Sequence, residues 1–256
     1  MSVASHAQPF YADAVPDADD GRRVGVLLSH GFTGAPASMV PWGEHLAGHG
    51  MAVAVPRLPG HGTTWQEMNK TRWPHWYAEL DSAFDKLRAN CDQVVVGGLS
   101  MGGALALQLA ADRGSEVAGV MLVNAAVASE NKQLLAVPLL QRVIRSRPGI
   151  GNDIKKPGQL EYGYDRVPLR ALASLLSSWK QIRHDLPRVT QPILSFRSRV
   201  DHVVDPSSHR LITSLVSSRD VEEHVLDNSY HVATLDNDAP QIFEKSARFV
   251  RRVTRP

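Results

Sequence analysis

Apolar runs alternate with segments of helical periodicity along most of the chain. The run VGVLLS at residues 24–29 is typical of a strand buried on both faces of a parallel sheet. Further strands are predicted at residues 51–55, 93–97, 117–123, 192–198 and 221–226. Helices are predicted at residues 36–48, 73–90, 101–113, 169–184, 206–216 and 239–252. Repeated strand–helix units predict an α/β fold, with a mostly parallel sheet covered by helices on both faces.

The alternation breaks down between residues 126 and 168. This segment has no clean strand, carries several prolines and glycines, and contains an apolar stretch at residues 134–144. We interpret it as a small cap inserted over the carboxyl edge of the sheet. Residues 1–125 and 169–256 would then form the core, and residues 126–168 the cap.

A glycine-rich turn joins a predicted strand to a predicted helix at residues 97–103, which read GGLSMGG. A strand before and a helix after this sequence are the context that identifies a G-x-S-x-G nucleophile elbow. Such a turn is tight and strained, so it needs glycines where a side chain would collide. It would raise Ser100 above the sheet, at the positive end of the helix that begins at Met101. We therefore expect Ser100 to be a nucleophile.

A serine hydroxyl is a weak nucleophile and requires a base, which is held in turn by an acid. In sites built on this turn the order along the chain is serine, acid, histidine. Asp201 follows the strand at residues 192–198, and His231 lies between the last predicted strand and the last helix. Both positions are carboxyl ends of strands, where α/β sheets place their sites.

Other residues compete for the same roles, since the chain has 11 histidines. Chain order favours His231 as the base, and Asp205 is better suited to capping the helix that follows Pro206. The competing residues are His30, His61, His202 and His209 for the base, and Asp205 and Asp227 for the acid.

Attack by a serine on a carbonyl creates an oxyanion, which two hydrogen-bond donors stabilise. One donor is expected from the backbone amide of Met101. The other should come from the loop after the strand at residues 24–29, which reads HGFTG at residues 30–34. Its expected donor is the amide of Phe32.

Composition excludes several other classes of protein. The net charge of +2 and the lack of an aromatic-interleaved basic stretch give no sign of nucleic-acid binding. Cys91 is the only cysteine, so no intrachain disulfide forms. There is no zinc-type cluster of histidine and cysteine, and we expect neither metal nor cofactor. No signal peptide or membrane-spanning run is seen, so we expect a cytoplasmic protein that can also lie peripherally on lipid surfaces.

Seven segments match a known family over nearly the whole chain. They are QPFYAD at 8–13, LLSHGFTG at 27–34, LPGHG at 58–62, GLSMGG at 98–103, GNDIKKP at 151–157, DHVVDP at 201–206 and NSYHVATLD at 228–236. In these segments the chain resembles the bacterial monoacylglycerol lipases and small carboxylesterases of the α/β-hydrolase superfamily. The family's catalytic pattern falls on Ser100, Asp201 and His231, with oxyanion donors at Phe32 and Met101.

The resemblance implies a cap that holds the acyl chain and senses glycerol. Ile150 matches an apolar wall residue, and Glu161 matches an acceptor for glycerol hydroxyls. The expected reaction is hydrolysis of a lipid ester, most simply a monoacylglycerol. The apolar stretch at residues 134–144 suits an acyl tunnel or contact with a lipid surface, or it packs the cap on the core.

Several alternatives remain at this point. The same chemistry would serve a general carboxylesterase of short or medium chain preference. The same triad is used by perhydrolases, C–C hydrolases and aminopeptidases, and an aminopeptidase would use an acid such as Glu161 to bind a free amine. A non-catalytic binding module is a further possibility. Oligomeric state is not predicted.

Overall fold

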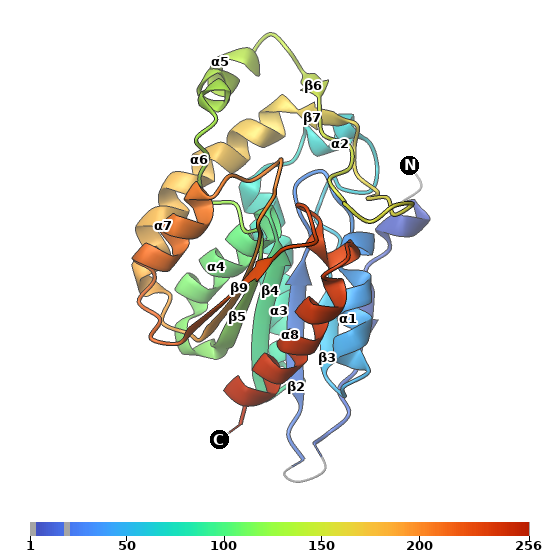
Figure 1. The fold of residues 1–256 in the computed structure, drawn as a ribbon, viewed down its shortest axis with the longest axis vertical. Helices are drawn as coiled ribbons and strands as arrows, with labels where there is room; N and C mark the ends of the chain where they lie inside the picture. The colour runs from blue at the N-terminus through green and yellow to red at the C-terminus, as the bar shows by residue number, and fades with distance from the viewer. Residues whose placement is uncertain (1–3, 18–20, 256) are drawn as a thin grey trace.

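Within residues 4–17 and 21–255, which this computed structural model describes, seven strands form the central sheet (Figure 1). Their order is β1-β3-β2-β4-β5-β8-β9, and all pairings are parallel except that of β1 with β3. The strands are β1 (Phe10–Ala12), β2 (Val24–Ser29), β3 (Ala52–Val55), β4 (Gln93–Leu99), β5 (Val117–Val123), β8 (Ile193–Ser198) and β9 (Val221–Leu226). The prediction of a mostly parallel α/β sheet is confirmed.

Helices connect most of these strands. The α-helices are α1 (Val40–Ala47), α2 (Trp65–Met68), α3 (Trp73–Arg88), α4 (Met101–Arg113), α5 (Val137–Leu140), α6 (Leu169–Asp185), α7 (Ser207–Leu215) and α8 (Ala239–Val253). Short 3₁₀ helices are η1 (Ser5–Ala7), η2 (Pro36–Ser38), η3 (Gly114–Glu116), η4 (Lys132–Ala136), η5 (Leu186–Arg188) and η6 (Ala233–Leu235). The connections between parallel neighbours are of the crossover kind that such a sheet requires.

The strands divide the core into two layers because successive side chains point to opposite faces of a sheet. Leu27 packs with residues of α3, α4 and α6 on one face. Its neighbours Val26 and Leu28 pack on the other face, with residues of α1 and α8. Figure 1 shows α1 and α8 together on that second face. Burial on both faces explains why β2 is a nearly continuous apolar run.

The segment at residues 126–168 arches over the end of the sheet opposite the C-terminus (Figure 1). It contains η4, α5 and a small antiparallel pair, β6 (Ser146–Pro148) with β7 (Arg166–Pro168). Tyr164 anchors it, because its amide donates to the carbonyl of Thr33 and its hydroxyl donates to that of Gly60. The division of the chain into core and cap at these boundaries stays a prediction.

Three features of the secondary structure differ from the sequence prediction. The edge strand β1 and the one-turn helix α2 were not expected, and both are too short to show a period. The predicted helix at residues 36–48 is divided into η2 and α1. The segment at residues 126–168 was expected to lack strands, but it contains the three-residue strands β6 and β7.

The strand order reverses direction between β2 and β4. From β2 the chain moves outward to β3, and from β4 it proceeds in the other direction to β5, β8 and β9. The loops after β2 and β4 therefore diverge from neighbouring strand ends, which is where open α/β sheets form binding crevices. The loop after β2 carries residues 30–34, and the turn after β4 carries Ser100.

Among the described residues, no helix is both long and apolar enough to cross a bilayer.

Replacing Leu27 by alanine should strongly destabilise the fold. Leu27 is fully buried in the central sheet, so Leu27→Ala leaves a cavity and should lower the free energy of unfolding by about 2–5 kcal/mol. Leu135 is 82% exposed, and Leu135→Ala should change stability by less than about 0.5 kcal/mol. Urea denaturation of both variants measures the difference. Equal losses would contradict the assignment of the core.

Candidate active site

Ser100 occupies a strained turn between β4 and α4. Its backbone angles are φ 57° and ψ −117°, in the region that side-chain-bearing residues rarely adopt. Two main-chain hydrogen bonds fix the turn, from the Ser100 amide to the Val123 carbonyl and from the Ala126 amide to the Ser100 carbonyl. The ladder of β5 therefore holds Ser100 at the end of its neighbour β4.

The glycine after this turn lets α4 pack directly against the end of β2. A Cβ atom at Gly102 would lie 2.1 Å from the carbonyl oxygen of Ser29, closer than any contact that real Cβ atoms make. A Cβ at Gly31, in the loop after β2, would lie 4.0 Å from the Ser100 hydroxyl oxygen. The loop at residues 30–34 consequently runs beside the Ser100 hydroxyl, and its role in binding an oxyanion stays a prediction.

Asp201 and His231 meet at the carboxyl ends of β8 and β9. The Nδ1 atom of His231 lies 2.8 Å from Oδ2 of Asp201, and both side chains are buried. The other oxygen, Oδ1, accepts from the amides of Val203 and Val204 at 2.8 Å each. Both oxygens of Asp201 are thus engaged, so its orientation is fixed. With Nδ1 donating to Asp201, the lone pair of the neutral ring is on Nε2.

The electrostatics around His231 favour its charged form. Burial alone lowers the pKa of His231, but the nearby charge of Asp201 and the hydrogen bond to it oppose this effect. Glu161 and Asp153 add further negative charge, and the net result is a pKa raised above the usual 6.5. A site with this arrangement stabilises the imidazolium that forms when histidine accepts a proton.

Asp153 binds the loop that carries His231, and the sequence analysis did not single it out. Its Oδ2 accepts from the amides of His231 and His202, at 3.2 and 3.1 Å. Its own carbonyl accepts from the amide of Val232. Asp153 belongs to GNDIKKP and His231 to NSYHVATLD, two of the seven segments that carry the family resemblance. Their joint presence in the sequence was the signal for this contact.

Asn124, just after the end of β5, also binds the loop that carries His231. It follows β5 with a positive φ of 46°, and its side-chain amide donates to the carbonyl of His231 at 2.7 Å. It also exchanges hydrogen bonds with Ser198 at the end of β8. The side chain therefore links the ends of the strands that precede Asp201 and His231. Nothing in the sequence around Asn124 marks this role.

His30 holds the loop after β2. Burial lowers the pKa of His30 to about 4, so the ring is neutral at ordinary pH. Its Nδ1 lies 3.0 Å from the carbonyl oxygen of Gly31, and its Nε2 accepts from the amide of Leu58. Phe32 follows directly and packs its ring edge-on against Trp76. These contacts fix the backbone whose Phe32 amide is the predicted oxyanion donor.

One cavity of about 570 Å³ connects the predicted site residues. Ser100, Asp201 and His231 line it, together with Phe32, Ile150 and Glu161. Met101, the other predicted oxyanion donor, is not among the lining residues and is buried at the start of α4. One wall is apolar and comes from the insert and from α6. Its residues are Leu134, Val167, Leu172, Leu175, Leu176 and Trp179.

Glu161 brings a carboxylate to this cavity. Burial raises the pKa of Glu161, with Asp153 adding to the rise and His231 opposing it. Its Oε1 lies over Gly34 of the loop after β2. Within the part of the chain that the structure describes, no donor is hydrogen-bonded to this carboxylate, so both oxygens are available to a ligand. Ile150 is 56% exposed at the cavity rim.

The other histidines considered for the role of base are engaged with other partners. His61 is buried against the His30 and Trp76 rings. His209 pairs with Glu223, and His202 with Asp153.

The competing acids are engaged too. Asp205 accepts from the amide of Ser207 at the start of α7 and from Ser129 and Glu130 in the insert. Asp227 pairs with Arg199. Chain order thus selected the acid and histidine that contact each other.

The apolar stretch at residues 134–144 does not form a tunnel. Leu134 alone among its large apolar side chains lines the cavity, and Val137 is buried in the core. The remaining side chains point away from both and are exposed: Leu135, Leu139, Leu140, Val143 and Ile144. The acyl-tunnel interpretation of this stretch is therefore wrong for most of it, and α6 provides most of the apolar wall instead.

Comparison with known proteins decides the family. Residues 21–238 match the model of the family described as serine aminopeptidase, S33. The thermostable monoacylglycerol lipase of Bacillus sp. (strain H-257) is 40% identical over 249 residues, which are 96% of this chain and 95% of the relative. The chain therefore belongs to the family that these two matches define. The predicted resemblance to bacterial monoacylglycerol lipases and small carboxylesterases is confirmed.

Solved structures of this superfamily share the fold. The structure reported for the metagenome-derived lipolytic enzymes LipS and LipT superposes with a TM-score of 0.92 and 41% identity, over 98% of this chain and 100% of that one. A soluble variant of monoglyceride lipase from Saccharomyces cerevisiae has a TM-score of 0.79 at 16% identity, over 97% of this chain and 92% of that one. The prediction of an α/β-hydrolase fold is confirmed.

Glu161→Gln should lower the pKa of His231. The negative charge of Glu161 is one of the groups that raise this pKa, and the amide of glutamine removes the charge at nearly constant shape. NMR titration of the His231 ring protons measures the change directly. Glu116 is exposed and does not line the cavity, so Glu116→Gln is the matched control and should leave this pKa in place. An unchanged or higher pKa in Glu161→Gln would contradict the electrostatic coupling.

Proposed function

We propose that this protein hydrolyses monoacylglycerols to a fatty acid and glycerol. The chain is a serine hydrolase of carboxylic esters, and the specific residues proposed for the reaction are Ser100, His231 and Asp201. The observation that supports this most directly is the 2.8 Å contact between His231 and Asp201 at the wall of a cavity that Ser100 also lines. Ser100 acts as nucleophile, His231 as base, and Asp201 orients the base.

In the first step, the Ser100 oxygen attacks the ester carbonyl while Nε2 of His231 takes the hydroxyl proton. The carbonyl π electrons move to oxygen, and the amides of Phe32 and Met101 stabilise the resulting oxyanion. The oxyanion then collapses and the bond to the glycerol oxygen breaks. The imidazolium of His231 gives its proton to that oxygen, which leaves an acyl group on Ser100.

In the second step, water replaces the alcohol. His231 is neutral again and takes a proton from water as the water oxygen attacks the acyl-enzyme carbonyl. Collapse of the second tetrahedral intermediate breaks the bond to Ser100, which recovers its proton from His231. The free fatty acid leaves. No step requires a metal or cofactor. His231 carries out the proton transfers, and the two amides stabilise the negative charge of the oxyanion.

The choice of monoacylglycerol as substrate rests on the apolar character of one side of the cavity and the carboxylate on the other. The apolar wall of Leu134 and α6 suits an acyl chain, since burying each methylene is worth about 0.8 kcal/mol. The carboxylate of Glu161 suits the two free hydroxyls of the glycerol group, which are strong donors to an anion. Ile150 is proposed to flank the acyl entrance at the rim.

The insert at residues 126–168 is proposed to act as a cap that contacts lipid. Its exposed apolar side chains include Leu135, Leu139 and Val143, at 82%, 68% and 80% exposure. Single exposed apolar residues are common, but several together on one short segment are typical of an interaction site. Transient contact with a membrane or lipid droplet through this segment would bring the substrate to the cavity. A cytoplasmic location stays a prediction.

Removing any one of the three proposed catalytic side chains should abolish most activity. Ser100→Ala, His231→Ala and Asp201→Ala should each lower kcat by about 10³-fold or more, and the double variants should lose little further, because the three act as one unit. Steady-state hydrolysis of a soluble ester measures this. Asp205→Ala is the control for the acid, and it should retain far more activity than Asp201→Ala. The reverse order would assign the acid to Asp205.

Glu161 should distinguish a monoacylglycerol from a plain ester. Loss of one charge-assisted hydrogen bond costs about 1.5–3 kcal/mol, so Glu161→Gln should lower kcat/KM for a monoacylglycerol by about 10- to 100-fold. An aryl ester of the same acyl chain has no free hydroxyls and should be affected much less. Both substrates are assayed with wild type, Glu161→Gln and Glu161→Ala.

Two other outcomes of this assay would change the assignment. Parallel losses on both substrates would make the protein a general carboxylesterase, in which Glu161 acts through the fold or through its charge near His231 and not on glycerol. The wild type could instead be more active on aminoacyl amides than on either ester. If Glu161→Gln lost that activity, the protein would be an aminopeptidase that binds a free amine through Glu161.

A further inference from the structure

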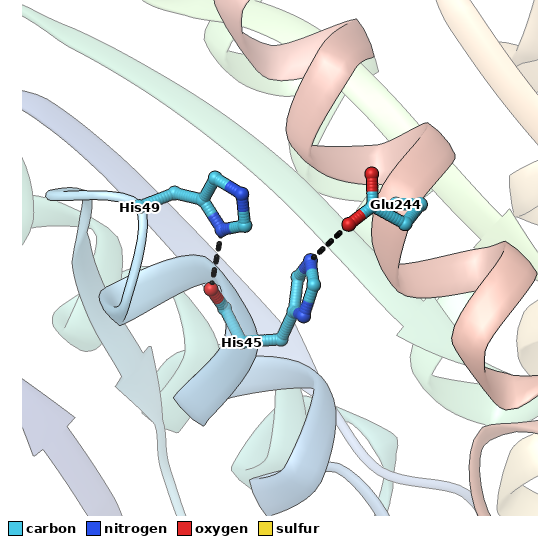
Figure 2. A group of neighbouring side chains, drawn as sticks. All are labelled: His45, His49 and Glu244. Atoms are coloured by element: carbon cyan, nitrogen blue, oxygen red, sulfur yellow. Dashed lines mark hydrogen bonds and ion pairs between the residues drawn. The ribbon is translucent and has the colours of Figure 1, made fainter.

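Two histidines and a glutamate lie together on the face of the molecule where α1 and α8 pack side by side. His45 is in the last turn of α1, His49 is four residues later in the turn that follows, and Glu244 is on α8 (Figure 2). None of the three lines the cavity that contains Ser100. The proposed hydrolysis makes no use of them.

The three side chains lie near enough to share one ion after small side-chain movements. One ligand atom from each residue lies within 4.8 Å of the other two. The Nε2 atom of His45 is 3.7 Å from Oε1 of Glu244, which is too long for a hydrogen bond. Tetrahedral zinc with bonds of about 2.0–2.2 Å separates its ligand atoms by about 3.3–3.6 Å. This pair therefore needs a shift of only a few tenths of an ångström to hold an ion between its atoms.

The Nε2 atom of His45 is buried and has no hydrogen-bond partner in the described part of the chain. A buried polar nitrogen without a partner is costly, and native structures normally satisfy such atoms. Figure 2 shows this atom directed toward Glu244. A cation between the two would satisfy the nitrogen lone pair and the carboxylate together.

His49 is already oriented as metal-binding histidines are. Its Nδ1 lies 2.8 Å from the carbonyl oxygen of His45, so Nδ1 carries the proton and donates it there. The lone pair of the ring is then on Nε2. A hydrogen bond from the other ring nitrogen to a backbone carbonyl is the usual outer support of a histidine ligand. The imidazole rings of His45 and His49 stand 4.6 Å apart between centroids.

The donor set indicates the class of ion. Two imidazole nitrogens and one carboxylate oxygen suit zinc and the other late divalent transition metals, whereas calcium and magnesium prefer sites made only of oxygen. Glu244 is 53% exposed, which leaves water free to fill a fourth position. Arg248 approaches the other carboxylate oxygen, Oε2, at 3.7 Å and so leaves Oε1 to the ion.

We propose that His45, His49 and Glu244 form a binding site for Zn²⁺ that joins α1 to α8. The proposed metal site lies on the two helices that follow the loops of the candidate active site. The loop at residues 30–34 leads through η2 into α1, and the loop that carries His231 leads through η6 into α8. The ion cross-links the two helices behind these loops, so its effect is on stability and not on the chemical step.

The test titrates ZnCl₂ into the full-length protein after EDTA treatment and dialysis. Calorimetry should show one Zn²⁺ bound per chain. At a concentration about 100 times the Kd, Zn²⁺ should raise Tm by about 5–10 °C, and EDTA should reverse the rise. Co²⁺ in place of Zn²⁺ should give the visible absorption of a four-coordinate nitrogen and oxygen site. Absence of binding and of a Tm shift in the wild type would overturn the proposal.

Single-residue variants show whether the ion is at this site. His49→Gln and Glu244→Gln should each weaken Zn²⁺ binding by at least about 10- to 100-fold, since loss of even an outer-shell partner has that effect. His209→Gln is the matched control, because His209 and Glu223 form another surface pair of histidine and carboxylate. It should bind Zn²⁺ like the wild type.

Folding of the variants is checked by their Tm without metal, which should match that of the wild type. Unchanged Zn²⁺ affinity in both His49→Gln and Glu244→Gln would overturn the proposal. Zn²⁺ could still inhibit these variants while the Tm rise is lost. That result would show a second, inhibitory ion at another site, and the stabilising site would remain assigned to α1 and α8.

Discussion

Ser100 adopts φ 57° and ψ −117° in the turn between β4 and α4, and the rest of the site is arranged around that turn. Such a backbone costs about 1–3 kcal/mol and persists only where the surroundings hold it. Here Val123 at the end of β5 and Ala126 in the segment that follows hold it through hydrogen bonds. The missing side chain of Gly102 lets α4 begin directly against Ser29, at the end of β2. The contacts that hold this strained turn thus place Ser100, the proposed nucleophile, beside the neighbouring loop at residues 30–34.

The histidine loop is positioned by contacts between segments far apart in the chain. Asp153 accepts from the amide of His231, Asn124 donates to its carbonyl, and Asp201 binds its ring. Asp236 adds a further tie, because it accepts from the amides of Lys155 and Lys156 in the insert. The segment at residues 126–168 is therefore hydrogen-bonded to the loop of the proposed base, so a movement of this segment would act on the position of His231.

The cavity concentrates negative charge around one histidine. Asp201, Glu161 and Asp153 all raise the pKa of His231 against the opposing effect of burial. This arrangement favours the imidazolium that the proposed reaction forms and then consumes. It also gives Glu161 two effects at once, because the carboxylate that is proposed to bind glycerol hydroxyls also contributes to the charge balance of the base. On this proposal, recognition of the alcohol and proton transfer by His231 would be coupled through the Glu161 side chain.

Local pattern determined much of this protein, because strand runs, helical periods and the GGLSMGG turn depend on residues adjacent in the chain. The fold, the family and the position of Ser100 in its turn followed from them, and chain order selected Asp201 and His231, whose catalytic roles stay a prediction. Tertiary structure alone decided the rest. Asp153 and Asn124 support His231 from other segments, α6 forms the apolar wall assigned to residues 134–144, and Glu244 joins His45 and His49 from the far end of the chain. Such contacts depend on how distant elements pack, which no local pattern records.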